Sequence, residues 1–194
     1  MSDSAIEGID EAGIASWFAT QIPGAVPPLR YELIAGGHSN LTFKVQDEID
    51  NVYVLRRPPL GQVLATAHDM EREHRVVSAV GQTAVPVPAT LGVCEDVEVN
   101  GAPFYVMAYV DGAVLHSDLE AASLTEKDRM SLSREVVEVL AELHSVEPDA
   151  IGLGDLAKRE EYLSRQLRRW SRQWEQSKTR ELDTMEEVQR LLEQ

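Results

Sequence analysis

The chain has 194 residues, of which 43% are hydrophobic, so it can bury a core as one large domain or two small lobes. Acidic residues outnumber basic ones by 33 to 18, and the net charge of −15 disfavours nucleic acid and anionic membranes as partners. A single cysteine, Cys94, excludes a disulfide framework and a cysteine-based zinc site, and the absence of a leader or long apolar segment predicts a cytoplasmic protein.

The first predicted element is a helix that begins after Asp10, a residue type that caps helices well. Its apolar residues recur at helical spacing and predict one buried face: Ile14, Trp17, Phe18 and Ile22. Prolines from Pro23 onward end the pattern.

Three short runs rich in β-branched and aromatic residues follow, and they predict strands at Leu29–Ile34, Leu41–Val45 and Val52–Leu55. Gly36-Gly37 separates the first two runs and Asp50-Asn51 separates the last two. Together they predict an antiparallel meander.

The segment Ala67–Val80 has a helical pattern, with apolar residues on one side and charges on the other. Two further strands are predicted at Thr90–Cys94 and Pro103–Val110, joined by a turn at Asn100-Gly101. Cys94 thereby falls on a buried strand.

Only helices are predicted after Gly112. Thr125 and Asp128 form an N-cap pair, and the spacing of apolar residues marks three helices, through Leu132–Leu143, Leu163–Trp174 and Met185–Leu192. The second overlaps a basic stretch, residues 158–180, which is interleaved with apolar residues and is interpreted as a solvated helix face.

This order of elements is α+β. It predicts a protein-kinase-like small lobe, with a five-stranded antiparallel sheet plus one helix, followed by a helical portion of a large lobe. The predicted division is residues 1–110, with a leading helix in residues 1–28, and residues 111–194 for the hinge and the helical part.

Two charged residues stand where nucleotide chemistry would need them. Arg56 ends the third strand, in the position of the lysine that contacts the α- and β-phosphates in kinases. Such a cation is oriented by an acidic residue on the next helix, and Glu73, 17 residues later, is the preferred candidate over Glu71. We expect Arg56 and Glu73 to face each other, although each alone would be interpreted as a surface charge.

The loop between the first two strands, Gly36-Gly37-His38-Ser39-Asn40, is a candidate phosphate-covering turn. Glycine lets backbone N–H groups approach phosphate, Ser39 offers a hydroxyl donor, and Asn40 can hold the turn. An ordinary β-turn explains these residues nearly as well.

The fifth strand leads into Met107-Ala108-Tyr109-Val110, before an Asp-Gly turn, and this segment is a candidate hinge between two lobes. Backbone groups of Ala108, Tyr109 and Val110 are predicted to bind an adenine edge, with Met107 behind it. The alternative is a buried strand that ends in a turn.

Motifs in this order resemble the aminoglycoside phosphotransferase family, in the subgroup that includes the kinase-like domain of some acyl-CoA dehydrogenases. The resemblance rests on residues 36–43, 53–59, 67–73, 85–88, 104–112, 140–146, 152–154 and 166–170. It implies a two-lobed fold and phosphorylation of a small-molecule hydroxyl that uses ATP and Mg²⁺. Arg56 occupies a position where lysine is common elsewhere, and its planar guanidinium is not equivalent to a point charge.

The catalytic loop of such enzymes, H-x-D-x-x-x-x-N, and the metal-binding aspartate that follows it do not occur where the family order requires them. His116-Ser117-Asp118 is similar but lies before the long helix and lacks the asparagine. We therefore expect the N-terminal portion of a longer enzyme, inactive alone, with no catalytic or metal-binding residue in this chain. The alternative is a non-catalytic nucleotide-binding or protein-interaction module, and exposed C-terminal helices would then allow self-association.

Overall fold

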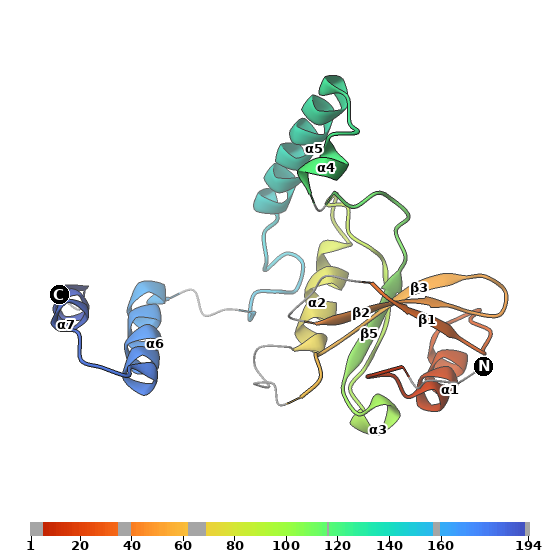
Figure 1. Cartoon of the computed structure of the whole chain (residues 1–194), viewed down its shortest axis with the longest axis horizontal. Helices are drawn as coiled ribbons and strands as arrows, with labels where there is room; N and C mark the ends of the chain where they lie inside the picture. Colours follow the sequence, from red (N-terminus) through yellow and green to blue (C-terminus); the bar gives the residue numbers. More distant parts are fainter. Residues whose placement is uncertain (1–5, 35–39, 62–68, 116, 157–159, 193–194) are drawn as a thin grey trace. The chain divides into compact units, whose positions relative to one another are not determined.

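The computed structural model describes residues 6–34, 40–61, 69–115, 117–156 and 160–192. The chain divides into two compact units, Met1–Ile151 and Gly152–Gln194. The first contains the sheet and its helices (Figure 1). The predicted assignment of residues 111–194 to a second lobe stays a prediction.

One antiparallel sheet organises the larger unit. Its order is β1-β2-β3-β5-β4, and all four pairings are antiparallel, as predicted. The strands are β1 Arg30–Leu33, β2 Leu41–Gln46, β3 Val52–Arg57, β4 Thr90–Cys94 and β5 Phe104–Ala108.

Helix α1, Glu11–Gln21, covers one face of the sheet (Figure 1). Asp10 caps it by accepting a hydrogen bond from the Gly13 N–H at 2.9 Å, as predicted. Its buried residues Ile14 and Phe18 meet side chains that alternate along the strands. These strand residues form the core with α1: Phe43, Val45, Tyr53, Leu55, Cys94, Phe104 and Val106.

A short helix that was not predicted, α3 Val97–Asn100, lies between β4 and β5 in the chain. Its alternating Val-Glu-Val sequence resembles a strand, and only the turn at Asn100-Gly101 was predicted. Asp96 caps the helix, and Gly101 ends it with a φ of 69°. The Asn100 side chain then accepts a hydrogen bond from the Asp10 N–H at 2.8 Å, which joins α3 to the start of α1.

Gly13 allows α1 to approach α3 closely, since a Cβ added there would lie 2.0 Å from the Val99 carbonyl oxygen. Gly13→Ala is expected to lower the free energy of unfolding by about 1–3 kcal/mol. The backbone shift needed to relieve the overlap costs more than alanine's higher helix propensity contributes. Urea denaturation measures the change. Gly112→Ala is the control, because nothing lies within 4 Å of its added Cβ. Equal stability of the two variants would contradict the prediction.

Helix α2, Met70–Val80, lies against β4 and β5. It begins three residues later than predicted, because Asp69 is its N-cap and accepts a hydrogen bond from the Arg72 N–H at 2.9 Å. Its Ser78 hydroxyl lies 2.6 Å from that of Thr90 on β4. In Figure 1, α1 and α2 lie on opposite sides of the sheet.

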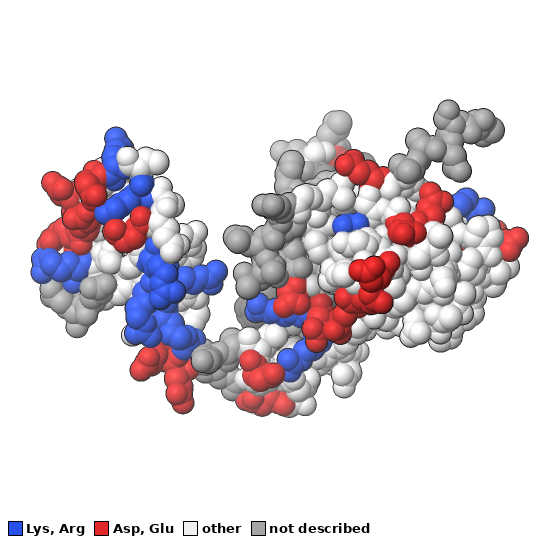
Figure 2. Space-filling model, turned by 90° about the horizontal axis from the view of Figure 1, so that it is seen from below, with Lys and Arg blue, Asp and Glu red and all other residues white. Residues whose placement is uncertain are grey.

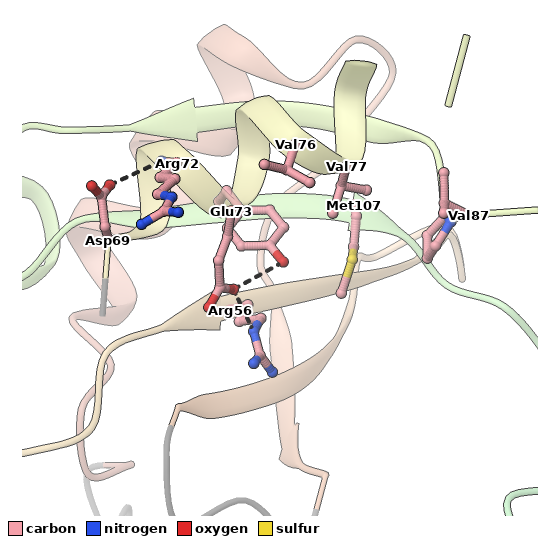
Figure 3. A pocket seen from close by; sticks show the side chains of 10 residues that line it. Arg56, Asp69, Arg72, Glu73, Val76, Val77, Val87 and Met107 are labelled. Carbon is pink, nitrogen blue, oxygen red and sulfur yellow. Dashed lines mark hydrogen bonds and ion pairs between the residues drawn. The ribbon is translucent and has the colours of Figure 1, made fainter. Parts of the chain in front are cut away.

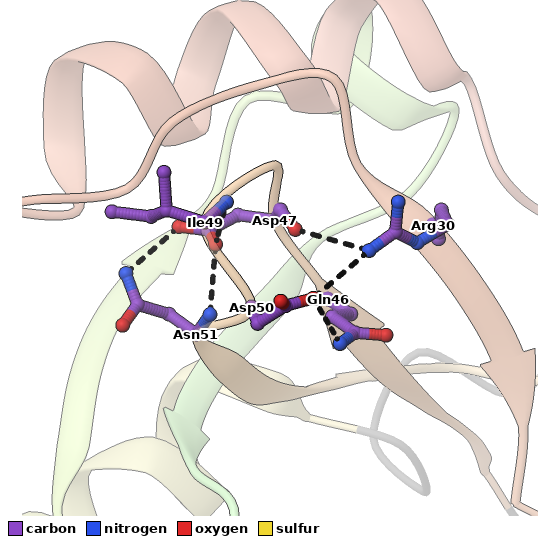
Figure 4. Close-up of polar contacts among 6 residues, drawn as sticks. All are labelled: Arg30, Gln46, Asp47, Ile49, Asp50 and Asn51. Carbon is purple, nitrogen blue, oxygen red and sulfur yellow. Dashed lines mark hydrogen bonds and ion pairs between the residues drawn. The ribbon is translucent and has the colours of Figure 1, made fainter.

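The turn between β2 and β3 is organised around Asp47, whose side chain is fully buried (Figure 4). Its carboxylate accepts hydrogen bonds from the backbone N–H groups of Val26, Ile49 and Asn51 and from the Asn51 side chain, at 2.8–3.1 Å. The Tyr53 hydroxyl adds a longer contact of 3.4 Å. Neighbouring Asp50 adopts a φ of 67°, which aspartate tolerates better than most residues.

The remaining helices are α4 Asp118–Ala121, α5 Glu126–Ser145, α6 Tyr162–Ser177 and α7 Asp183–Leu192. The predicted cap of α5 is confirmed as a capping box between Thr125 and Asp128. None of these helices contains a buried residue among those described. Within the described ranges, no helix has both the length and the apolar composition needed to cross a membrane.

The basic stretch lies on α6, where Arg168, Arg169 and Arg172 are exposed, in agreement with the predicted solvated face. Figure 2 shows Lys and Arg side chains gathered on the unit of residues 152–194, beside a group of acidic ones. Acidic side chains dominate the strip visible on the larger unit in the same view.

Candidate functional site

Strand alternation separates two consecutive arginines at the end of β3. Arg57 is buried and donates hydrogen bonds to the carbonyl oxygens of Pro58 and Gly8. Arg56 points to the opposite face, where it pairs in register with Thr42 on β2 and Tyr105 on β5. Of these two arginines, only Arg56 can therefore act on the face of the sheet that α2 covers.

Glu73 on α2 is the centre of a polar cluster on this face (Figure 3). Its Oε2 accepts from Arg56 Nε at 2.8 Å and from the Tyr105 hydroxyl at 3.4 Å. Its Oε1 accepts from Asn40 Nδ2 at 2.8 Å. The predicted contact between Arg56 and Glu73 is thus present as an ion pair, and the side chains are 30% and 35% exposed.

A pocket of about 560 Å³ opens beside this pair. Arg56, Glu73 and Tyr105 form part of its wall, together with Asp69 and Arg72 (Figure 3). The rest of the lining is apolar: Val76, Val77, Val87, Pro88 and Met107. Its volume and its mixture of apolar wall and few polar groups are typical of small-molecule sites.

The predicted hinge follows β5. Met107 reaches the pocket, but the Ala108 N–H already donates to the Ala89 carbonyl oxygen at 2.8 Å. Among the described residues, the N–H groups of Tyr109 and Val110 donate no hydrogen bond. Lys44 lies over the Tyr109 ring, with its Nζ 5.0 Å from the ring centroid. The Ala108 N–H is thus engaged within the sheet, and the adenine-edge role of the backbone groups of Ala108–Val110 stays a prediction.

Four residues of the predicted glycine-rich turn, Gly36, Gly37, His38 and Ser39, lie outside the described residues, as does His116 of the similar motif. Asn40, the last residue of that turn, is buried and reaches Glu73. That contact was not predicted, because a hydrogen bond to the local backbone already explains an asparagine in a turn.

Two residues that were not predicted from the sequence, Thr42 and Tyr105, complete the cluster. The Thr42 hydroxyl accepts from Arg56 Nη1 at 2.9 Å. Both residues pair with Arg56 in the sheet register, and cross-strand partners share a face. Pairing the second, third and fifth predicted strands in antiparallel register would have placed both residues beside Arg56 from the sequence alone.

Tyr105 provides a test at alkaline pH. Burial, with the nearby Glu73 carboxylate, raises the pKa of Tyr105 from 10.0 to about 12. Because the pKa of Tyr105 is higher in the folded than in the unfolded protein, the neutral phenol stabilises the fold fully below about pH 10, and this contribution is lost as the pH rises toward 12. Between pH 10 and pH 12 the free energy of unfolding of wild type is therefore expected to fall by up to about 2 kcal/mol more than that of Tyr105→Phe. Urea denaturation from pH 8 to pH 12 measures both slopes, and identical slopes would contradict the assignment.

Within the described ranges, no group of three or more His, Cys, Asp or Glu side chains could hold a metal ion. Asp118 begins α4, and its side chain is outside the description. No magnesium site is therefore assigned among the described residues.

The sequence profile described as "Phosphotransferase enzyme family" matches residues 30–194. The chain belongs to this family. Phosphotransferase-family relatives of known structure include a candidate aminoglycoside phosphotransferase from Ralstonia eutropha, 33% identical, with a TM-score of 0.72. The match covers 93% of this chain and 52% of that one. The predicted resemblance and the kinase-like α+β fold are both confirmed.

Curated relatives of this phosphotransferase-family chain are much longer proteins. Acyl-CoA dehydrogenase family member 10 of Mus musculus is 34% identical over 78% of this chain and 14% of its own length. Acyl-CoA dehydrogenase family member 11 of Gallus gallus is 34% identical over 90% of this chain and 22% of its own length. The chain thus spans less than a quarter of these two proteins.

Proposed function

We propose that this chain supplies the nucleotide-binding lobe of an ATP-dependent phosphotransferase that phosphorylates a hydroxyl group of a small molecule. The observation that carries the proposal is the Arg56–Glu73 ion pair between β3 and α2, at the side of a pocket. A cation oriented by a helix carboxylate is the arrangement that kinases use to hold phosphates. Family membership supports the reaction type.

The residues present fit part of a nucleotide. Arg56 has donors for phosphate oxygens, and the apolar wall near Met107 suits a base or another flat apolar group. The amides of Tyr109 and Val110 would hold the base edge, and the glycine-rich turn would cover the phosphates. Mg²⁺ would neutralise phosphate charge when bound, and its ligands are proposed to lie outside this chain.

Residues 1–194 alone are proposed to bind ATP weakly and to turn over no substrate, because phosphoryl transfer needs a metal and a residue that receives the acceptor's proton. Calorimetric titration with ATP and Mg²⁺ tests the binding. ATP consumption with amino-alcohol and aminoglycoside acceptors tests turnover. Acceptor-dependent ADP release that Asp118→Asn abolishes would contradict the proposed inactivity. No ATP binding by any method would favour a protein-interaction module instead. A cytoplasmic location is also proposed.

Self-association is a second proposal, supported by apolar side chains that are more than half exposed. Leu163 and Trp170 on α6 are 79% and 59% exposed, and Met130, Val136 and Val137 on α5 are exposed as well. Large exposed apolar faces mark interaction sites, and a second copy presents the same face. Sedimentation velocity is expected to show concentration-dependent dimers that Leu163→Ser with Trp170→Ser abolishes. The exposed polar change Arg169→Ser serves as the control. A protein that stays monomeric at every concentration would exclude self-association through this surface.

A further inference from the structure

The two carboxylate oxygens of Glu73 have different partners. Oε2 takes the Nε of Arg56 at 2.8 Å, whereas Oε1 takes the Nδ2 of Asn40 at 2.8 Å. Because a carboxylate only accepts hydrogen bonds, the atom of Asn40 that faces Oε1 must be its amide nitrogen. The contact joins residues 33 positions apart and links the start of β2 to α2.

This division limits how Glu73 pairs with Arg56. An arginine beside a carboxylate commonly forms two parallel hydrogen bonds, for example through Nε and Nη2. Here Glu73 engages only Nε, and Nη1 donates to the Thr42 hydroxyl at 2.9 Å. Among the described residues none accepts a hydrogen bond from Nη2. The Nη2 amino group of the partly exposed Arg56 guanidinium therefore keeps N–H donors that no described residue uses.

We propose that Asn40 is a positioning residue that acts through Glu73. By holding Oε1, it prevents Glu73 from closing onto Nη2 and keeps that amino group available to a phosphate-type anion. The role rests on the proposed function, since the anion is taken to be the nucleotide's phosphates. Asn40 suits this role because the residue is only 6% exposed, so water competes poorly for the hydrogen bond.

A double-mutant cycle separates this indirect role from direct contact between Asn40 and the anion. Asn40→Ala is made in wild type and in Glu73→Ala, with inorganic pyrophosphate as the probe in NMR titrations. Asn40→Ala is expected to weaken pyrophosphate binding about tenfold in wild type, because Nη2 becomes engaged by Glu73. It is expected to change nothing in Glu73→Ala. An equal loss in both backgrounds would overturn the proposal in favour of direct contact.

The guanidinium signals of Arg56, assigned by their loss in Arg56→Lys, give a readout without any ligand. In Asn40→Ala the Nη2 protons are expected to become hydrogen-bonded to Glu73, with slower rotation about the Cζ–Nη2 bond. Unchanged signals would overturn the positioning role. If Asn40→Ala does not fold, Asn40→Ser provides the same test, because serine is too short to reach Glu73.

The two readouts also distinguish this inference from the proposed function. If wild type binds no pyrophosphate, the phosphate role of Arg56 and the use of Nη2 for an anion both fail. The Arg56 signals then still decide whether Asn40 sets the geometry of the ion pair.

Discussion

Asp47→Ala is expected to lower the free energy of unfolding by about 3–5 kcal/mol, the largest effect of any single substitution considered for this chain. The Asp47 carboxylate is fully buried and accepts hydrogen bonds from Val26, Ile49 and Asn51. Its removal leaves those donors unsatisfied where water cannot readily replace it. Urea denaturation measures the loss.

Glu48→Ala is the matched control for Asp47→Ala, because Glu48 lies in the same turn but is exposed. It is expected to change stability by less than about 0.5 kcal/mol. A loss of less than about 1 kcal/mol in Asp47→Ala would contradict the organising role of this carboxylate.

The same carboxylate predicts an acid dependence. Burial favours the neutral form of Asp47, but hydrogen bonds from the Asn51 side chain and from the backbone of Val26, Asn51 and Ile49 outweigh it and lower the pKa. Because the folded pKa lies below the unfolded value, this stabilisation is present above about pH 4 and is lost as the pH falls through the folded pKa. Below about pH 4, the free energy of unfolding of Asp47→Asn should therefore depend less on pH than that of wild type does.

Arg56→Met is expected to weaken ATP binding about 10- to 100-fold, the range for losing a charge-assisted hydrogen bond to phosphate. Its guanidinium lines the pocket and is oriented by Glu73, so methionine keeps the apolar stem but removes the donors. NMR titration with ATP suits the weak affinity expected of this chain.

Two variants make the result for Arg56 specific. Arg56→Lys keeps the charge but loses the fork that engages Glu73 and phosphate together, so an intermediate affinity is expected. Arg75→Met removes an exposed charge of α2 outside the pocket and should bind ATP as wild type does. Equal affinity of Arg56→Met and wild type would remove the central support for a nucleotide site.

Much of the fold could be predicted because its signals are local. Apolar spacing identified α1 and α5–α7, Asp10 and Thr125 marked helix starts, and alternating strands predicted the sheet. The Arg56–Glu73 pair was also predictable, since a fixed order of strand and helix brings two residues 17 positions apart together. The family itself followed from motifs, which carry more information than composition.

The sequence alone determined the α+β class, the five strands, and the candidate cation with its carboxylate, because these depend on periodicity and order along the chain. Only the tertiary structure decided that Asp47 is a buried acceptor, that α3 touches Gly13, and that Asn40 reaches Glu73. An aspartate in a turn and an asparagine after a glycine loop have ordinary local explanations. Their partners come from distant segments, and packing alone determines which oxygen meets which donor.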